Sequence, residues 1–331
     1  VGTRHAVSLR ARLAPVLLLA VLLAWWSEVL VWTNPPGREL LDWPLMLLEY
    51  SVVAALLLDV LMRYRVRDLF GALLVSGLYS LIASLTLNPE SLLAELPRTL
   101  VTRIMGAHAL LALEMIGLFL ALTGGLAPAA RRRVMVGSVI VGLAWGVWVR
   151  WFPADAGYPP ASLTTMLLYG AAFMMVIALL LARLPRWTAA LTPDDLRLSR
   201  RGWLIACLLL IGLAGWRGLA GELPLDALWL VLPVLALCWV ILWFRGRARG
   251  YTLLDGRIPA QPVAWGSFVA AAALFFGVAI IGYQLPLIQV GEFTQLTLIG
   301  VGFTAYGLAW LPTVSLVLGV QAYLRQFQAA A

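Results

Sequence analysis

Long apolar stretches, separated by short polar segments, make up most of the chain. A helix that crosses the hydrocarbon core of a bilayer needs about 20 predominantly apolar residues. Ten stretches reach this length and predict ten transmembrane helices, at residues 13–33, 43–62, 69–87, 101–123, 134–152, 163–184, 202–220, 225–244, 263–283 and 293–323. We therefore expect an all-α integral membrane protein, a bundle of about ten helices.

The segments between these stretches carry the residues that are typical of turns. Examples are the run Asn34-Pro35-Pro36-Gly37 and the residues that follow Asn88, because Pro and Gly interrupt helices and favour turns. None of the connections is long enough to hold a folded soluble domain. The sequence thus predicts that residues 1–331 form a single polytopic transmembrane domain. The first apolar stretch lacks a small-residue cleavage site, so we expect it to remain as an uncleaved helix.

Composition supports the membrane interpretation. Hydrophobic residues make up 62% of the 331 residues and charged residues only 12%, about half the share found in soluble proteins. This balance excludes a soluble globular enzyme, a disordered chain and a collagen-like chain.

The charges predict an orientation in the membrane. All 24 basic residues are arginines, and the net charge is +8. With the N-terminus in the cytoplasm, the ten-helix pattern puts all of them on the cytoplasmic side except Arg38, Arg98, Arg103, Arg150 and Arg217. Such an excess follows the positive-inside rule. We therefore expect both termini in the cytoplasm and the protein in a prokaryotic inner membrane. The arginines form short clusters rather than one continuous face, which excludes nucleic acid as a partner.

The last predicted helix is unusually long. At 1.5 Å per residue, 293–323 would exceed the bilayer core, so the helix is either tilted or broken near Pro312. Gly300 and Gly302 lie in the same segment, and broken helices often line the binding sites of transporters. Gly and Pro are also ordinary in membrane helices.

Ionisable side chains within the predicted helices are the main candidates for function, because burying them in a membrane is costly. Glu28 lies late in the first helix and Glu49 early in the second, while Arg103, His108 and Glu114 lie in the fourth. In the predicted topology these five residues lie in the outer half of the membrane. We hypothesise that they form a proton-accepting site that opens to the outer face, with Glu114 as its mid-membrane carboxylate.

Three further features refine this hypothesis. Arg103 and Glu114 are eleven residues apart, about three helical turns, so they share a helix face, and His108 lies off it. Arg150 and Arg217 close the outer ends of two helices and are candidate contacts for an anion. The alternative is that the arginines extend to the membrane interface and pair structurally with the acids. For Asp59 we expect a local ion pair with Arg63.

Cofactor motifs do not emerge from the sequence. The phosphate-binding GxxxxGK[ST] motif, a strand-associated GxGxxG motif and the zinc-binding HExxH motif are all absent. The only cysteines, Cys207 and Cys238, lie in apolar stretches, and no metal site is predicted. No cofactor is evident, although a quinone or a lipid remains open as a ligand.

Three classes of function remain open. The first is a transporter or permease for a small or amphipathic substrate, with proton coupling as an option. The second is a membrane-embedded subunit of a larger complex that handles quinol or protons, with other membrane subunits as partners besides the bilayer. The third is a membrane enzyme that acts on a lipid or lipid-linked substrate. In helix count and orientation, the chain resembles drug/metabolite transporters and the quinol-interacting membrane subunits related to polysulfide reductase.

Overall fold

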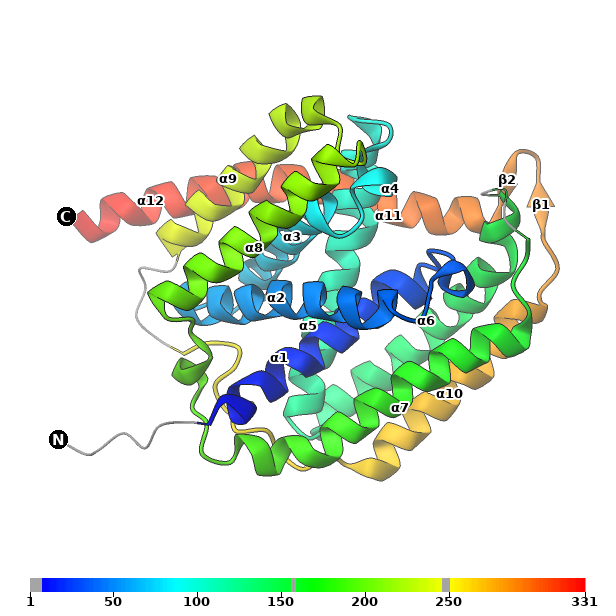
Figure 1. The fold of residues 1–331 in the computed structure, drawn as a ribbon, viewed down its shortest axis with the longest axis horizontal. Coiled ribbons are helices and arrows are strands. Elements are labelled where there is room, and N and C mark those ends of the chain that lie inside the picture. The colour runs from blue at the N-terminus through cyan, green and yellow to red at the C-terminus, as the bar shows by residue number, and fades with distance from the viewer. Residues whose placement is uncertain (1–7, 156, 158, 246–250, 331) are drawn as a thin grey trace. The chain divides into compact units, whose positions relative to one another are not determined.

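The computed structural model describes residues 8–155, 157, 159–245 and 251–330 (Figure 1). The chain is 79% helical, and within the described residues ten helices are long and apolar enough to cross a membrane. The predicted all-α class and the predicted number of apolar helices are thus confirmed. These helices fit a multi-pass membrane protein.

Several of the ten apolar segments are built from more than one helical element. The first five segments are α1 (Leu9–Ala24) with the π-helix η1 (Trp25–Leu30), α2 (Asp42–Arg63), α3 (Leu69–Thr86), the π-helix η3 (Leu100–His108) with α5 (Ala109–Thr123), and α6 (Pro128–Asp155). The others are α7 (Leu163–Thr188), α8 (Arg200–Leu219), the 3₁₀ turn η5 (Leu225–Ala227) with α9 (Leu228–Arg245), α10 (Trp265–Gln284), and α11 (Gln295–Pro312) with the π-helix η6 (Thr313–Leu318) and α12 (Gly319–Ala330).

Short elements occupy the connections. They are the 3₁₀ turns η2 (Pro35–Gly37) and η4 (Pro193–Leu196), the helix α4 (Pro89–Leu93), and the strands β1 (Gln289–Val290) and β2 (Phe293–Thr294). The two strands form an antiparallel hairpin in which Gln289 pairs with Thr294 and Val290 with Phe293. The hairpin was not expected from the sequence, since two-residue strands are too short to give an alternating pattern.

Helix boundaries follow local capping chemistry. The hydroxyl of Ser162 accepts a hydrogen bond from the backbone N–H of Thr165 and so caps α7, while Ser199 caps α8 in the same way. Capping of this kind satisfies a donor that the first helical turn leaves open. α6 begins at Pro128, six residues before the predicted start at 134. Its first turns carry three arginines, which an apolar criterion leaves out although they continue the helix.

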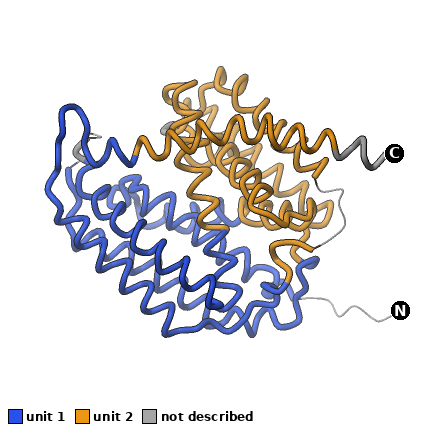
Figure 2. Tube along the Cα trace, turned by 180° about the vertical axis from the view of Figure 1, so that it is seen from behind, with its two compact units in different colours: residues 1–51, 117–195, 256–299 blue, residues 52–116, 196–255, 300–331 orange. Residues whose placement is uncertain are grey.

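The chain divides into two compact units that alternate along the sequence (Figure 2). Unit 1 comprises residues 1–51, 117–195 and 256–299, and unit 2 comprises 52–116, 196–255 and 300–331. Unit 1 therefore contains α1, η1, α6, α7 and α10, whereas unit 2 contains α3, η3, α8, α9, η6 and α12. Each unit is described by itself below.

In unit 1, α6 and α10 run side by side, and glycines allow their backbones to approach closely (Figure 1). A Cβ atom on Gly142 would lie 2.6 Å from the carbonyl oxygen of Phe275, and one on Gly282 would lie 2.5 Å from that of Leu143. Small residues are frequent where membrane helices pack closely. The aromatic ring of Trp145 stacks on Phe275 at 5.2 Å in the same interface. α1 packs against α7.

In unit 2, α3 is the central helix, in contact with α8, α9 and η3. Glycine again permits a close crossing, because a Cβ atom on Gly106 would lie 2.6 Å from the carbonyl oxygen of Phe303. The indole of Trp310 is buried beside Gly77 and donates a hydrogen bond to the carbonyl of Leu73 at 3.1 Å.

A buried carboxylate fixes the start of α8 within unit 2. Asp59 is 0% exposed and accepts hydrogen bonds from Arg63 at 2.7 and 2.8 Å. It also accepts one from the backbone N–H of Leu198 at 2.8 Å, while Arg63 donates to the carbonyl of Leu198 at 3.1 Å. The predicted Asp59–Arg63 ion pair is confirmed. We call these three residues the Asp59 clamp.

Candidate functional site

The first apolar segment ends in an unusual backbone. Its last turn is the π-helix η1, and such segments occur frequently at functional sites. The helix is closed by Trp32, which adopts the left-handed conformation at φ 57°, and Asn34 does so two residues later at φ 53°. Helices commonly end with a left-handed residue, but glycine or asparagine usually fills that position. A tryptophan at this position is strained, so its indole must gain enough from its contacts to offset the strain.

Glu28 holds the segment that follows η1. This carboxylate is 1% exposed and accepts hydrogen bonds from the hydroxyl of Thr33 at 2.7 Å and from the hydroxyl of Tyr50 at 2.6 Å. It also forms an ion pair with Arg38. Because Thr33 and Arg38 bracket the loop 33–38, one buried carboxylate anchors both ends of that loop. We call these four residues the Glu28 clamp.

Aromatic side chains of α6 and α7 fix the same segment from the other side. The indole N–H of Trp148 donates to the carbonyl of Val31 at 2.6 Å, and the hydroxyl of Tyr169 donates to the carbonyl of Pro35 at 3.4 Å. Trp43 stacks on Tyr169 with ring centres 5.7 Å apart. The backbone on both sides of Trp32 is therefore held by side chains of two helices, α6 and α7.

The connection between α6 and α7 is anchored by Tyr283 of α10. The hydroxyl of Tyr283 donates to the carbonyl of Ala161 at 2.5 Å. Arg150 lies over the rings of Trp151 and Tyr283, 5.2 Å from each ring centre, and its guanidinium donates to the Tyr283 hydroxyl at 3.4 Å. Such cation–π contacts stabilise an arginine at an apolar surface.

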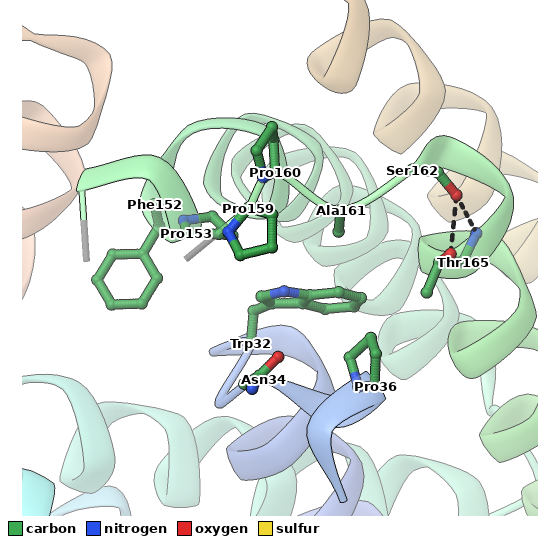
Figure 3. Close-up of a pocket in the computed structure, with 10 residues that line it drawn as sticks. All are labelled: Trp32, Asn34, Pro36, Phe152, Pro153, Pro159, Pro160, Ala161, Ser162 and Thr165. Atoms are coloured by element: carbon green, nitrogen blue, oxygen red, sulfur yellow. Dashed lines mark hydrogen bonds between the residues drawn. The ribbon is translucent and has the colours of Figure 1, made fainter. Parts of the chain in front are cut away.

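A cavity of about 220 Å³ lies between these two anchored loops within unit 1 (Figure 3). We call it the Trp32 pocket. In Figure 3 the indole of Trp32 lies between Pro159 and Ala161 on one side and Pro36 on the other. The residues that line the pocket are Trp32, Asn34, Pro36, Phe152, Pro153, Pro159, Pro160, Ala161, Ser162 and Thr165.

Apolar rings and polar groups share the lining of the pocket. Two aromatic rings and four prolines are among the ten described lining residues, and none of these ten is ionisable. The hydroxyls of Ser162 and Thr165 are hydrogen-bonded to each other at 2.8 Å. Asn34, which is exposed, adds an amide group to the lining. A concave surface that combines apolar rings with polar groups is a usual form of a small-molecule site.

The residues of the predicted proton site are divided between the two units. Glu28 and Glu49 belong to unit 1, while Arg103, His108 and Glu114 belong to unit 2. Glu28 takes part in the clamp described above, and Glu49 is half-buried on α2.

Within unit 2 the three predicted residues have different environments. His108 closes the π-helix η3 and is 5% exposed, whereas Arg103 and Glu114 are exposed. The expectation that Arg103 and Glu114 share a helix face stays a prediction, because it assumed α-helical spacing and Leu100–His108 is a π-helix. Glu114 thus presents an exposed carboxylate in the middle of a segment long enough to span a membrane.

The two arginines predicted to contact an anion both have protein partners. Arg150 contacts Tyr283 and Trp151, as described above. Arg217 forms an ion pair with Glu222 at 2.7 Å and donates to the carbonyl of Thr86 at 3.3 Å. Both side chains are half-buried.

The long last segment changes its helical form after Pro312. α11 continues through Gly300 and Gly302, and η6 begins at Thr313, directly after the proline. Pro lacks the backbone donor that an α-helix requires at that position, which accounts for the local change.

Sequence reasoning did not single out the pocket-lining residues. Asn34, Pro36, Pro159 and Pro160 lie in segments that carry turn signals, and Trp32 lies at the end of an apolar stretch, where tryptophan is common. The proline content of the two loops was a signal that both were rigid. That the two loops meet depends on the packing of α1 against α7, which the sequence does not reveal.

Among the residues that the structure describes, no group of three or more His, Cys, Asp or Glu side chains is placed to hold a metal ion. No protein-family model, curated protein or solved structure matches the chain.

Proposed function

We propose that the protein is a multi-pass membrane transporter or permease for a small or amphipathic substrate, with the Trp32 pocket as its recognition site. The observation that carries this proposal is a cavity whose two walls are each fixed by buried polar contacts, Glu28 beneath one loop and Tyr283 beneath the other. A site held by supporting contacts in this way is preorganised, which favours binding.

The position of the pocket in the chain agrees with this role. Its walls come from the end of η1, the end of α6 and the start of α7, so it lies at one end of the apolar segments of unit 1. With the orientation predicted by the arginines, this end faces outward, in a prokaryotic inner membrane with both termini in the cytoplasm. A pocket there would receive substrate from outside the cell.

We assign proton coupling, as an optional part of this proposal, to Glu114. An exposed carboxylate within an apolar segment is costly unless it has a role, and proton relays use such residues. His108, six residues earlier on the same segment, is the second titratable group of unit 2 in this hypothesis.

The test is substrate flux into liposomes that contain the purified full-length chain. A panel of small neutral and amphipathic compounds is screened, and the compound with protein-dependent uptake is followed in variants. We expect Trp32→Ala to reduce uptake at least tenfold. The matched control is Trp229→Ala, which removes an exposed tryptophan on α9 of unit 2 and leaves uptake unchanged. Protein-dependent uptake that Trp32→Ala leaves unchanged would refute the assignment of the pocket.

The coupling hypothesis has its own test. Uptake by parent protein and by Glu114→Gln is compared with and without an imposed pH gradient. We expect the gradient to accelerate uptake by the parent only. If Glu114→Gln responds to the gradient as the parent does, Glu114 has no coupling role.

A second candidate function is a membrane-embedded subunit of a larger complex that handles quinol or protons. The observation that favours it is again Glu114, because an exposed mid-segment carboxylate would be satisfied by a partner helix. Native mass spectrometry of a mild-detergent extract from the source membrane, together with an absorption spectrum, separates the two functions. Co-purifying subunits or a chromophore support the complex, whereas the chain alone or as a small homo-oligomer supports the transporter.

A further inference from the structure

We propose that unit 1 holds a site for an anionic phospholipid, whose headgroup phosphate contacts Arg131 and Arg257 and whose acyl chain enters an apolar cavity. The site lies at the opposite end of α6 from the Trp32 pocket, because Arg131 is in the first turn of this helix and Phe152 in its last. The inference goes beyond the proposed function and does not depend on it.

A second cavity in unit 1 is suited to hydrocarbon. It has a volume of about 60 Å³, and all of its lining residues belong to unit 1. Twelve of the thirteen lining side chains are apolar, and Ser138 is the exception. An ordered water needs two to four polar partners, which these side chains do not supply. The volume gives room for roughly four to six groups the size of water, which corresponds to a short stretch of an acyl chain.

Arg131 lies beside this cavity on α6. It precedes Val134, a residue of the cavity lining, by three positions. Residues three apart are neighbours on the surface of a helix, so Arg131 is on the side of α6 that carries the lining. Its side chain is exposed. A charged group here is one helical turn from the apolar wall.

Arg257 approaches the same cavity from the segment before α10. A Cβ atom on Gly124 would overlap the guanidinium of Arg257, so the charged group lies against the backbone of this glycine. Two lining residues, Leu122 and Leu126, flank Gly124 in the chain. The backbone N–H of Gln261 fixes the segment, because it donates to the last carbonyl of α5 at 2.8 Å. A second guanidinium is thus held at the edge of the cavity.

The protein does not neutralise these two arginines. Among the described residues, no acidic side chain forms an ion pair with Arg131 or Arg257. Arg132 and Arg133, which follow Arg131, are exposed and add to the positive charge. Arginine binds phosphate oxygens through paired N–H donors, so the phosphate of a lipid supplies the missing negative charge.

Trp265 marks the boundary between the charged and the apolar parts of the site. It begins α10, is 43% exposed and packs against Phe268 of the cavity lining with ring centres 5.7 Å apart. Tryptophan is enriched at the level of the lipid headgroups. Arginines, an interfacial tryptophan and an apolar cavity together match the phosphate, the ester region and the acyl chain of one phospholipid. Free phosphate would use only the arginines, and a neutral lipid only the cavity.

The experiment titrates lipid into the delipidated full-length chain in detergent and counts the bound molecules by native mass spectrometry. One probe is palmitoyl-oleoyl phosphatidylglycerol, which is anionic. The other is the phosphatidylcholine with the same acyl chains, which is zwitterionic, and inorganic phosphate serves as a competitor. We expect one high-affinity site for phosphatidylglycerol, at least tenfold weaker binding of phosphatidylcholine, and no displacement by inorganic phosphate.

The double variant Arg131→Gln with Arg257→Gln tests the headgroup contacts. An arginine near the membrane surface contributes about fivefold to the affinity for an anionic lipid, so we expect phosphatidylglycerol to bind at least tenfold more weakly. The matched control is Arg200→Gln with Arg201→Gln, which removes the same charge at exposed positions of α8 in unit 2. We expect this control to leave the affinity unchanged.

Ala272→Leu tests the acyl-chain contacts, because the longer side chain occupies the cavity that Ala272 lines. We expect it to weaken the binding of phosphatidylglycerol about threefold. Ala273→Leu is the matched control, since Ala273 is exposed on the same helix and is not part of the lining. Thermal unfolding in detergent checks that both variants are folded at the temperature of the titration.

Four outcomes would overturn the inference. Equal binding of the two lipids would show that the headgroup charge is not recognised, and displacement by inorganic phosphate would indicate an anion site without a lipid chain. If the double arginine variant binds like its control, Arg131 and Arg257 do not hold the phosphate. If Ala272→Leu binds like Ala273→Leu, the cavity does not receive the chain. None of these measurements depends on substrate uptake, so the inference and the proposed function succeed or fail separately.

Discussion

Glu28 in unit 1 and Asp59 in unit 2 are both buried carboxylates that accept hydrogen bonds from an arginine and from other donors. Each fixes a segment outside its own helix. Asp59 holds its arginine four residues away on the same helix, together with the backbone of Leu198 before α8. Glu28 binds the side chains of Thr33, Arg38 and Tyr50. The loop 33–38 that it fixes forms one wall of the Trp32 pocket.

An acid in an apolar segment therefore does not by itself indicate proton transfer. Asp59 stabilises a helix start, Glu28 stabilises a pocket, and only Glu114 presents an exposed carboxylate among these three. What separates them is the set of donors that the fold brings to each.

Glu28→Gln should destabilise the protein by about 3 kcal/mol, because breaking one side of a largely buried ion pair leaves the other charge uncompensated. Arg38 is only 25% exposed, so solvent cannot fully replace the lost partner. Thermal unfolding in detergent measures the effect. Substrate uptake into liposomes should fall as well, since the loop 33–38 loses its anchor. The double variant Glu28→Gln with Arg38→Met should recover part of the stability, and a single variant as stable as the parent would contradict the clamp.

Asp59→Asn should cost less, about 2 kcal/mol, because Arg63 is 32% exposed and regains water when its partner is neutralised. The same unfolding assay measures it. In contrast to Glu28→Gln, this variant should leave ligand binding to the Trp32 pocket intact. If Asp59→Asn reduces ligand binding as much as Glu28→Gln does, the Asp59 clamp also supports the Trp32 pocket and the two clamps do not have separate roles.

Gly142→Ala should destabilise unit 1 by about 1 to 3 kcal/mol, the usual cost of overpacking. Its added methyl group would lie 2.6 Å from the carbonyl oxygen of Phe275. Gly137→Ala on the same helix is the matched control, because no atom lies within 4 Å of its added methyl group. That control should be neutral or slightly stabilising, since alanine favours helix over glycine. Similar melting temperatures for the two variants would argue against the close crossing of α6 and α10.

Tyr283→Phe should have the smallest effect, about 1 kcal/mol, because it removes the hydrogen bond to Ala161 and the long one from Arg150 but keeps the ring under Arg150. We expect a modest fall in substrate uptake into liposomes, as the α6–α7 connection loses one of its contacts. Tyr323→Phe, at an exposed tyrosine of unit 2, is the control and should leave uptake unchanged. Uptake by Tyr283→Phe equal to that of the parent would show that the Trp32 pocket does not depend on the contact between Tyr283 and Ala161.

The helices were the most predictable part of the molecule. Residues 69–87 were predicted and Leu69–Thr86 observed, and the second helix was predicted at 43–62 and observed at Asp42–Arg63. Apolar length is nearly sufficient when the surroundings are lipid. The predicted bounds were wrong where a helix continues into polar residues, as at the start of α6. The change from α-helix to π-helix in η1 was not predicted, because the composition of the segment does not change there.

The candidate site was less predictable, for a physical reason. The Asp59–Arg63 pair could be predicted, since residues four apart on a helix are neighbours. Glu28 and Arg150 were recognised as unusual, but their partners Tyr50 and Tyr283 come from other helices, and only tertiary packing brings them close. The roles of these residues stay predictions until the variants are measured.

The alternation of the two units along the chain has a consequence for biosynthesis. α6 leaves the ribosome more than one hundred residues before α10, the helix against which its glycine face packs. α7 of unit 1 and α8 and α9 of unit 2 are translated between them. A transmembrane helix is stable in lipid on its own, so it can be inserted before the helix that it packs against has been synthesised. Unit 1 therefore completes its assembly after translation of most of the protein, and during that interval the face of α6 is open to chaperones, to proteases or to a wrong helix.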